Sequence, residues 1–114
     1  MPGGGRNVGA MFRHVVMFKW NPGTSAETVE KVTDGLTACG RALAVTRSYT
    51  CGPDVQTAGG LGGAEDRFDF AIVADFDDEA GWRVYDQDPE HNRLRAELIR
   101  PLIAQRVTVQ FETT

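Results

Sequence analysis

The clearest strand in this sequence reads RFDFAIVADF and runs from Arg67 to Phe76. Its residues alternate in character, which is typical of a β-strand with one side in a core. One face carries Phe68, Phe70, Ile72, Ala74 and Phe76, and the other carries Asp69, Ala71, Val73 and Asp75. We therefore expect a central strand here, and the neighbouring segments show what it pairs with.

Upstream, a second alternating stretch runs from Phe12 to Trp20 and places His14 on its more apolar face. Thr24-Ser25-Ala26-Glu27 predicts a capping box that opens an amphipathic helix, with Gly40 at its C-terminal cap. A weaker strand is expected from Leu43 to Cys51.

Downstream, Asp77 or Asp78 is expected to cap a short helix that runs to about Tyr85. Asp88-Pro89 then begins another helix, because Asp favours the N-cap and Pro the first helical position. Pro101 ends or kinks this helix. A last strand is expected from Gln105 to Phe111.

The predicted order is β-α-β-β-α-β, with the last helix broken in two. This order indicates an α+β, ferredoxin-like domain with helices on one face of a four-stranded antiparallel sheet. The other sheet face would carry Val15, Met17, Ala71 and Val73, uncovered by any helix of the same chain. Because large exposed apolar patches usually mark interfaces, we expect a homodimer that packs sheet against sheet.

Length, charge and composition indicate which classes of partner and cellular location to expect. The chain has 114 residues and a formal charge of −4, which predicts one domain at 11–114 preceded by a flexible tail at 1–10. Scattered basic residues argue against a nucleic-acid or membrane partner. No stretch resembles a signal peptide or a membrane span, so we expect a cytoplasmic protein. Cys39 and Cys51 have no metal-ligand spacing and are read as reduced thiols.

A glycine-rich loop is expected from Asp54 to Asp66. Its glycines fit neither the G-x-G-x-x-G pattern nor the P-loop spacing, and the P-loop lysine is missing. We interpret the segment as a mobile loop that can gate a site.

The candidate site rests on three residues: His14, Tyr85 and His91. The Asp88-Pro89 break allows Tyr85 and His91 to turn inward together, toward His14 on the first strand. The predicted cavity walls, which form the candidate substrate-binding residues, are Phe18, Phe70, Ile72, Trp82 and Leu94. Imidazole and phenol groups can move protons without a cofactor. The alternative is structural: a core histidine bonded to the backbone, a packing tyrosine and an exposed histidine.

Several segments together resemble the stress-responsive dimeric α/β barrel family. They are Arg13 to Lys19, Phe68 to Phe76, Tyr85 with Asp88-Pro89-Glu90-His91, and Ile99 to Ile103 with the final strand. The resemblance covers about Phe12 to Glu112 and implies ferredoxin-like subunits that pair into a barrel. It also implies a link to a plant polyketide cyclase of this family, which makes olivetolic acid by aldol ring closure.

His14, Tyr85 and His91 match that cyclase's site positions one by one, whereas Asp88 stands where a histidine is common. The family resemblance also implies magnesium binding by backbone carbonyls in some members, and the matching stretch here is Gly40 to Thr46.

The leading hypothesis is a cofactor-independent cyclase or lyase that acts on a β-keto, polyketide-like substrate. His91 would be the general base, Tyr85 the hydrogen-bond donor to the enolate and His14 the orienting group. Two alternatives remain open: a non-catalytic stress or ligand-binding dimer that holds a small apolar molecule, and a cofactor-free monooxygenase.

Overall fold

The computed structural model describes residues 9–57 and 66–114. It confirms the ferredoxin-like fold, with a four-stranded antiparallel sheet in the order β2-β3-β1-β4. The strands are β1 (Phe12–Trp20), β2 (Thr46–Pro53), β3 (Phe70–Phe76) and β4 (Ile103–Glu112), and the helices are α1 (Ala26–Ala42), α2 (Glu79–Gln87) and α3 (Pro89–Leu94). A π-helical turn, η2 (Arg95–Ile99), and a 3₁₀ turn, η3 (Arg100–Leu102), connect α3 to β4.

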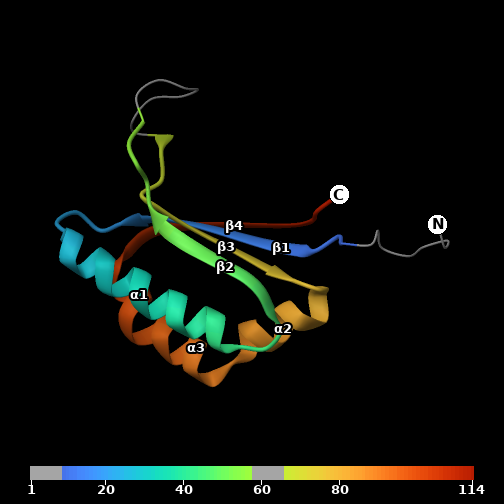
Figure 1. Ribbon diagram of the computed structural model, residues 1–114. Coiled ribbons are helices and arrows are strands. Elements are labelled where there is room, and N and C mark those ends of the chain that lie inside the picture. The colour runs from blue at the N-terminus through green and yellow to red at the C-terminus, as the bar shows by residue number, and fades with distance from the viewer. Residues whose placement is uncertain (1–8, 58–65) are drawn as a thin grey trace.

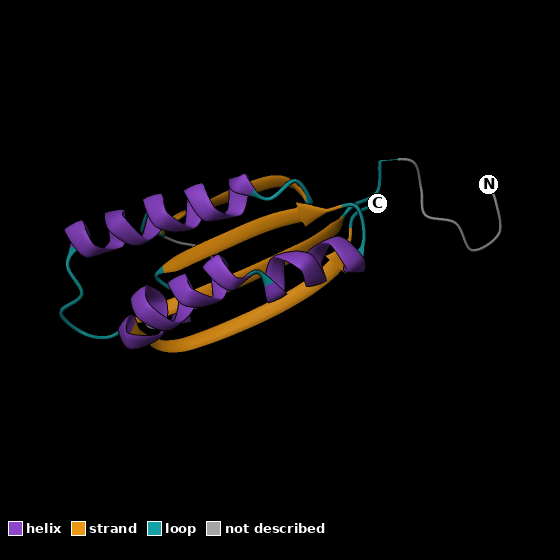
Figure 2. Ribbon diagram, turned by 90° about the horizontal axis from the view of Figure 1, so that it is seen from below, coloured by secondary structure: helices purple, strands orange, loops and turns teal. Residues whose placement is uncertain are grey.

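The molecule has two layers (Figure 1), with all the helices on one side of the sheet. Seen from below in Figure 2, the long helix α1 runs along one half of the sheet, and α2 with α3 runs along the other. No helix of the described residues is long and apolar enough to cross a membrane.

The core lies between the sheet and the helices. His14, Val16 and Phe18 of β1 are buried in alternation, as the sequence pattern predicts. They pair in register with Ala74, Ile72 and Phe70 of β3, which are buried on the same side. Val32 and Leu36 of α1 complete this core with almost no exposed surface. Because Cβ directions alternate along a strand, His14 must point toward the helices.

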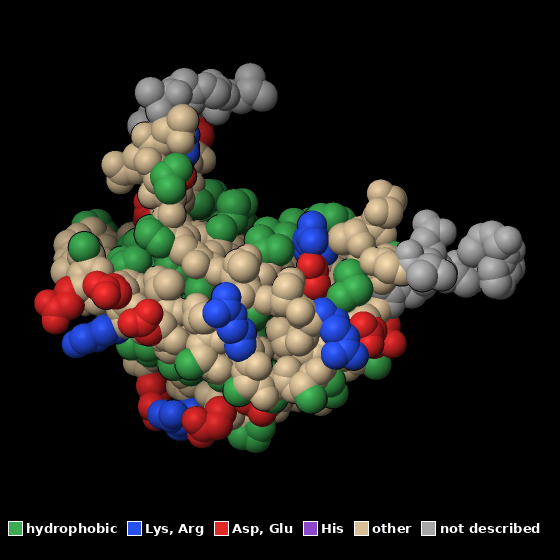
Figure 3. Space-filling view, in the orientation of Figure 1, with side chains coloured by type: hydrophobic (Ala, Val, Ile, Leu, Met, Phe, Trp, Pro, Cys, Tyr) green, Lys and Arg blue, Asp and Glu red, His purple; other side chains and the backbone are tan. Residues whose placement is uncertain are grey.

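The opposite side of the sheet has no helical cover (Figure 1). We call it the outer sheet face, and the pairing registers place on it the apolar side chains of Val15, Met17, Ala71, Val73, Val107, Val109 and Phe111. Val109 is 56% exposed and Phe111 47% exposed. Figure 3 shows hydrophobic side chains along this upper edge of the molecule.

The predicted ends of α1 are wrong at both termini. The hydroxyl of Ser25, not that of Thr24, accepts the amide N–H of Thr28 and caps the helix. Thr24 instead donates its hydroxyl to the carbonyl of Asn21. At the other end, Gly40 does not cap the helix, which continues to Ala42.

The boundaries of β2 and β3 also differ from the predicted ones. Because α1 is longer than predicted, the chain turns at residues 43–45, with Thr46 N–H bonded to the carbonyl of Leu43, and β2 begins at Thr46. β3 begins at Phe70 instead of Arg67, because the carboxylate of Asp69 accepts the backbone N–H of Trp20 and the chain bends there. Phe68 therefore lies outside the strand, with the ammonium of Lys19 5.1 Å from its ring centroid.

Other predicted features are present. Asp78 caps α2 and Asp88 caps α3, with Pro89 in its first turn. Most of the predicted tail at 1–10 and the central part of the glycine-rich loop at 54–66 lie outside the described residues. The flanks of that loop are held together by a bidentate ion pair between Arg67 and Asp54.

Gly40 serves a packing role, because a Cβ built there would lie 2.4 Å from a ring carbon of Tyr49. We expect Gly40→Ala to destabilise the protein by about 1–3 kcal/mol through overpacking. Gly35→Ala is the matched control in the same helix, since its Cβ would meet only the flexible ends of Leu94 at 3.4 Å and Leu98 at 3.6 Å. This control should be neutral or stabilising by about 0.5–1 kcal/mol, from the helix propensity of alanine. Urea unfolding of both variants measures the difference, and equal effects would contradict the packing role.

Candidate functional site

A cavity of about 580 Å³ opens between the helix-facing side of the sheet and the α2–α3 segment. Its volume lies in the range of small-molecule sites. The three candidate residues His14, Tyr85 and His91 all line it. All three are almost fully buried in the chain, at 5%, 3% and 3% exposure.

The junction between α2 and α3 brings Tyr85 and His91 together. Asp88 adopts an extended conformation with φ −62° and ψ 126°, which interrupts the helix. Its backbone N–H bonds to the carbonyl of Tyr85, and its carboxylate accepts the backbone N–H of His91. The two rings consequently lie 4.1 Å apart between centroids. On an uninterrupted helix, residues six apart would point in different directions.

His14 approaches the same pair from β1, with its ring centroid 6.1 Å from that of Tyr85. Its Nδ1 lies 2.8 Å from the amide nitrogen of Gln110, which is its register partner on β4. Since an amide nitrogen only donates, Nδ1 accepts this bond, and neutral His14 carries its proton on Nε2. His14 is therefore anchored to a side chain, not to the backbone.

Burial sets the protonation of both histidines. Desolvation is the largest cause of the lowering of the pKa of His14 to about 4, and the charge of Arg106 adds to it. The pKa of His91 is also lowered to about 4, mainly by desolvation and next by Arg95. Both imidazoles are thus neutral at pH 7 and able to accept a proton. The Nδ1 atom of His91 is buried without a hydrogen-bond partner among the described residues.

The phenol of Tyr85 remains protonated, because burial raises its pKa to about 12. Its hydroxyl lies 3.5 Å from that of Tyr49, a buried residue of β2 that sequence reasoning missed. Tyr49 is a weak partner at this distance, so the Tyr85 hydroxyl retains capacity to donate to a bound molecule.

Of the five predicted wall residues, the structure places Phe18, Ile72 and Trp82 at the cavity. Phe70 lies behind Phe18, stacked on it at 6.0 Å between ring centroids. Leu94 points toward α1 instead, where its side chain faces Gly35.

Sequence reasoning also missed the charged residues of the cavity wall. Asp86, Arg95, Arg100 and Arg106 line it. The guanidinium of Arg95 bonds to the carboxylate and carbonyl of Asp86 and to the side chain of Asn92. A π-helical turn, η2, begins directly after Leu94, and the residues from Arg95 onward therefore depart from regular helix periodicity.

The magnesium stretch that the resemblance implies, Gly40 to Thr46, does not fit a cation. The carbonyl of Leu43 accepts the N–H of Thr46, and that of Ala44 accepts the guanidinium of Arg47 at 3.2 Å. A guanidinium held against a carbonyl repels a second cation. Among the described residues, no group of three or more His, Cys, Asp or Glu side chains is placed to hold a metal ion.

The family model described as the stress responsive A/B barrel domain (Dabb) matches residues 12–113. No curated protein matches the chain.

Solved structures match over nearly the whole chain. A dimeric ferredoxin-like protein of unknown function from Thermobifida fusca is 36% identical, with a TM-score of 0.78, covering 91% of this chain and 92% of its own. A Dabb family protein from Mesorhizobium loti is 13% identical, with a TM-score of 0.73 and coverage of 92% and 98%. A hydroxynitrile lyase from Passiflora edulis is 15% identical, with a TM-score of 0.76 and coverage of 91% and 94%. The last two show a shared fold alone.

The lowered pKa values of the two histidines make stability depend on pH. The unfolded chain binds protons near pH 6.5 and the folded chain only near pH 4, so stability is full above pH 6.5 and falls on acidification. These are the only two histidines in the chain. We expect a loss of about 1–2 kcal/mol for each between pH 7 and pH 5.

Urea unfolding at several pH values measures this loss. The variant His14→Gln/His91→Asn should show a flat profile between pH 7 and 5. A wild-type profile that is already flat would contradict the neutral, buried state of the histidines.

Proposed function

The chain belongs to the stress responsive A/B barrel domain family, and on that premise we propose that it is an enzyme that moves a proton on a small β-keto molecule. The reaction class is a cofactor-independent lyase or cyclase, and the finer proposal is aldol-type ring closure of a polyketide-like substrate. The observation that carries the proposal is the Tyr85–His91 pair, whose rings lie 4.1 Å apart in the wall of the cavity.

His91 is the proposed general base. A carbon between two carbonyls is acidic enough for a neutral imidazole to remove its proton in a dry site. His91 is neutral at pH 7, so its unprotonated ring nitrogen is able to accept a proton. The imidazole takes the proton, and the electron pair of the broken C–H bond moves into the enolate.

Tyr85 is the proposed stabiliser of the enolate oxygen. Its hydroxyl stays protonated and has only the distant hydroxyl of Tyr49 as a described partner. A preorganised donor of this kind gains strength as charge develops on the oxygen. The enolate carbon then attacks a second carbonyl of the same molecule, a C–C bond forms, and the new alkoxide takes the proton back from the His91 imidazolium.

His14 is the proposed positioning residue. Gln110 fixes its ring through Nδ1, which leaves the Nε2–H group as its donor. A donor at this edge of the cavity can orient a substrate carbonyl, while Phe18, Ile72 and Trp82 contact the apolar part of the molecule.

The second candidate is a ligand-binding protein without chemistry. The low pKa of His91, about 4, favours it, because a general base works best when its pKa lies near the working pH. A cofactor-free monooxygenase is a third candidate, and oxygen consumption with an anthrone or a quinol distinguishes it from a cyclase.

We also propose that the chain forms a homodimer through the outer sheet face. This face leaves large apolar side chains exposed, and a monomer rarely presents such a patch to water. The Thermobifida fusca protein, at 36% identity, is itself dimeric. A twofold pairing of two identical faces is the simplest way to cover them.

The activity is tested with a poly-β-keto thioester, by following the absorbance of the aromatic product that forms once the cyclic aldol adduct loses water. We expect His91→Asn to lower kcat/KM by about 10²–10⁴, the usual contribution of a general base. Tyr85→Phe should lower it by about 10², the loss of one enolate donor. Val84→Ala, at an exposed neighbour of Tyr85, is the control and should retain full activity.

Thermal unfolding of each variant separates chemistry from folding. An inactive but fully folded His91→Asn protein supports the proposal. Tight binding of the thioester by wild type and His91→Asn alike, without turnover in either, would establish the ligand-binding candidate instead.

The dimer is tested by sedimentation velocity of Val109→Glu. A charge on the outer sheet face should shift the protein from dimer to monomer, because a buried unpaired carboxylate costs several kcal/mol, of the order of the interface energy itself. Val84→Glu is the matched control, since Val84 is 51% exposed but lies on α2 in the helical layer. A Val109→Glu protein that stays dimeric would place the interface elsewhere.

A further inference from the structure

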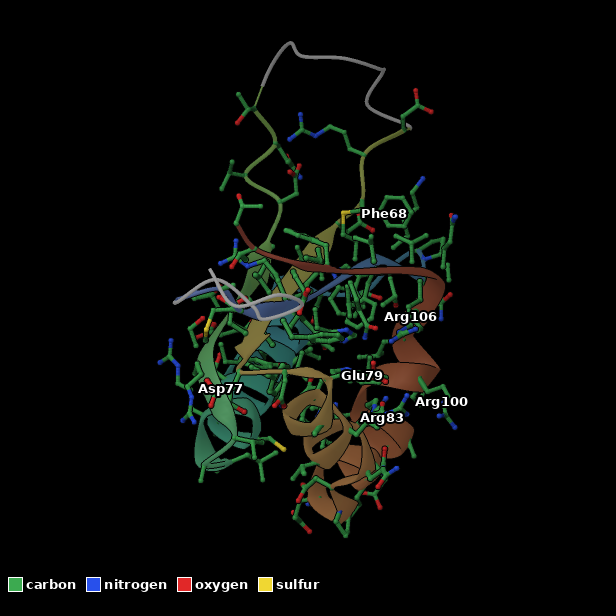
Figure 4. All side chains as sticks on the ribbon, turned by 90° about the vertical axis from the view of Figure 1, so that its right-hand side faces the viewer. Phe68, Asp77, Glu79, Arg83, Arg100 and Arg106 are labelled. Carbon is green, nitrogen blue, oxygen red and sulfur yellow. The ribbon has the colours of Figure 1, made fainter. Side chains whose placement is uncertain are left out.

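Arg106 occupies an unusual position for a charged residue. It pairs in register with Phe18, and both side chains therefore lie on the helix-facing side of the sheet. It lines the cavity, and within residues 9–57 and 66–114 nothing forms a hydrogen bond or ion pair with its guanidinium. Figure 4 shows Arg106 on the edge strand β4 and Arg100 below it in the helical layer, on the same side of the molecule.

The charges around the cavity do not balance. Arg95 is paired with Asp86, and Asp86 is the one carboxylate among the described lining residues. Arg100 and Arg106 are left without a described partner, although the chain as a whole carries a formal charge of −4. The cavity is therefore locally positive in an acidic protein.

Arg106 keeps an exposed side chain in the single chain and stands at the open side of the cavity. Desolvation and the charge of Arg95 both lower its pKa. A guanidinium that lines a cavity without a described partner is free to pair with a negative group of a bound molecule. Guanidinium groups bind carboxylates and phosphates through two parallel hydrogen bonds, so the expected partner is an oxyanion.

The other lining residues indicate what the rest of the ligand looks like. Phe18, Ile72 and Trp82 form an apolar wall. Two buried donors of lining residues, Nε1 of Trp82 and Nε of Arg95, have no described partner. An apolar wall with convergent donors selects an amphipathic ligand that carries acceptor oxygens.

We propose that the cavity binds an organic anion, with a planar apolar body between Phe18, Ile72 and Trp82 and an oxyanion paired with Arg106. The oxyanion is a carboxylate or a phosphate monoester. This inference rests on the proposed function, because it names a ligand class of the same site, to which a planar product of ring closure can belong. Arg100 provides a second positive charge at the mouth and steers such a ligand inward.

A bound anion also changes the electrostatic environment of the cavity histidines. After desolvation, the charge of Arg106 lowers the pKa of His14, and the charge of Arg95 lowers the pKa of His91. An oxyanion that neutralises Arg106 therefore raises the pKa of His14.

The test compares three probes of one shape: 2-naphthoate, 2-naphthyl phosphate and neutral 2-naphthamide. The chain has two tryptophans, so the ¹⁵N-detected indole N–H of Trp82 reports on the cavity, and that of Trp20, which does not line it, is the internal reference. We expect at least one anionic probe to bind about tenfold more tightly than the amide, as a charge-assisted pair allows.

Arg106→Gln should remove that preference while leaving naphthamide binding unchanged. Arg47→Gln is the control, since it deletes the same charge from an exposed pair with Asp77, remote from the cavity. The tighter of the two anionic probes identifies the oxyanion.

Equal binding of all three probes, or a preference that survives Arg106→Gln, would overturn the anion site while leaving a small-molecule cavity in place. If no probe shifts the Trp82 resonance, the anion site and the cavity's role as a ligand site both fail.

Discussion

The interruption at Asp88 is the constraint on which the candidate site depends. One residue ends α2 and begins α3, because the backbone N–H of Asp88 donates to the carbonyl of Tyr85 and its carboxylate accepts the N–H of His91. Pro89 supports this geometry by lacking the N–H that a continuous helix needs. Without the break, Tyr85 and His91 would lie on different faces, and the cavity would hold one polar group of the pair.

The second constraint is desolvation. The cavity wall buries two imidazoles and a phenol deeply enough to keep all three uncharged at pH 7. The two neutral histidines cost the protein stability at low pH, a cost that a purely structural core of this size can avoid with apolar side chains. Both histidines lie at one place, where the side chains of β1 meet the α2–α3 junction. Functional sites commonly carry such local costs.

Sequence reasoning succeeded where alternation and caps dominate. The period-two pattern of β1 and the Asp88-Pro89 pair predicted the element order and the convergence of His14, Tyr85 and His91. It failed at boundaries such as Gly40, where Tyr49 from a strand packs against a helical glycine. That contact joins residues of two elements, and no local pattern encodes it.

Sequence reasoning also did not predict the charged residues of the cavity wall. Arg106 and Gln110 enter the site because β4 pairs with β1 in one register. A shift of one residue would turn both side chains to the outer sheet face. Arg95 enters because a π-helical turn, invisible to helix periodicity, follows Leu94. Register and helix irregularity therefore account for most of what the sequence left undetermined.

The most direct test of the central claim is a ¹⁵N NMR titration of the two histidine side chains between pH 3.5 and 8. The structure predicts neutral rings at pH 7, with His14 protonated on Nε2 and both titrating near pH 4. Titration of either ring near pH 6.5, the value of a solvent-exposed histidine, would contradict a dry site built around the Tyr85–His91 pair.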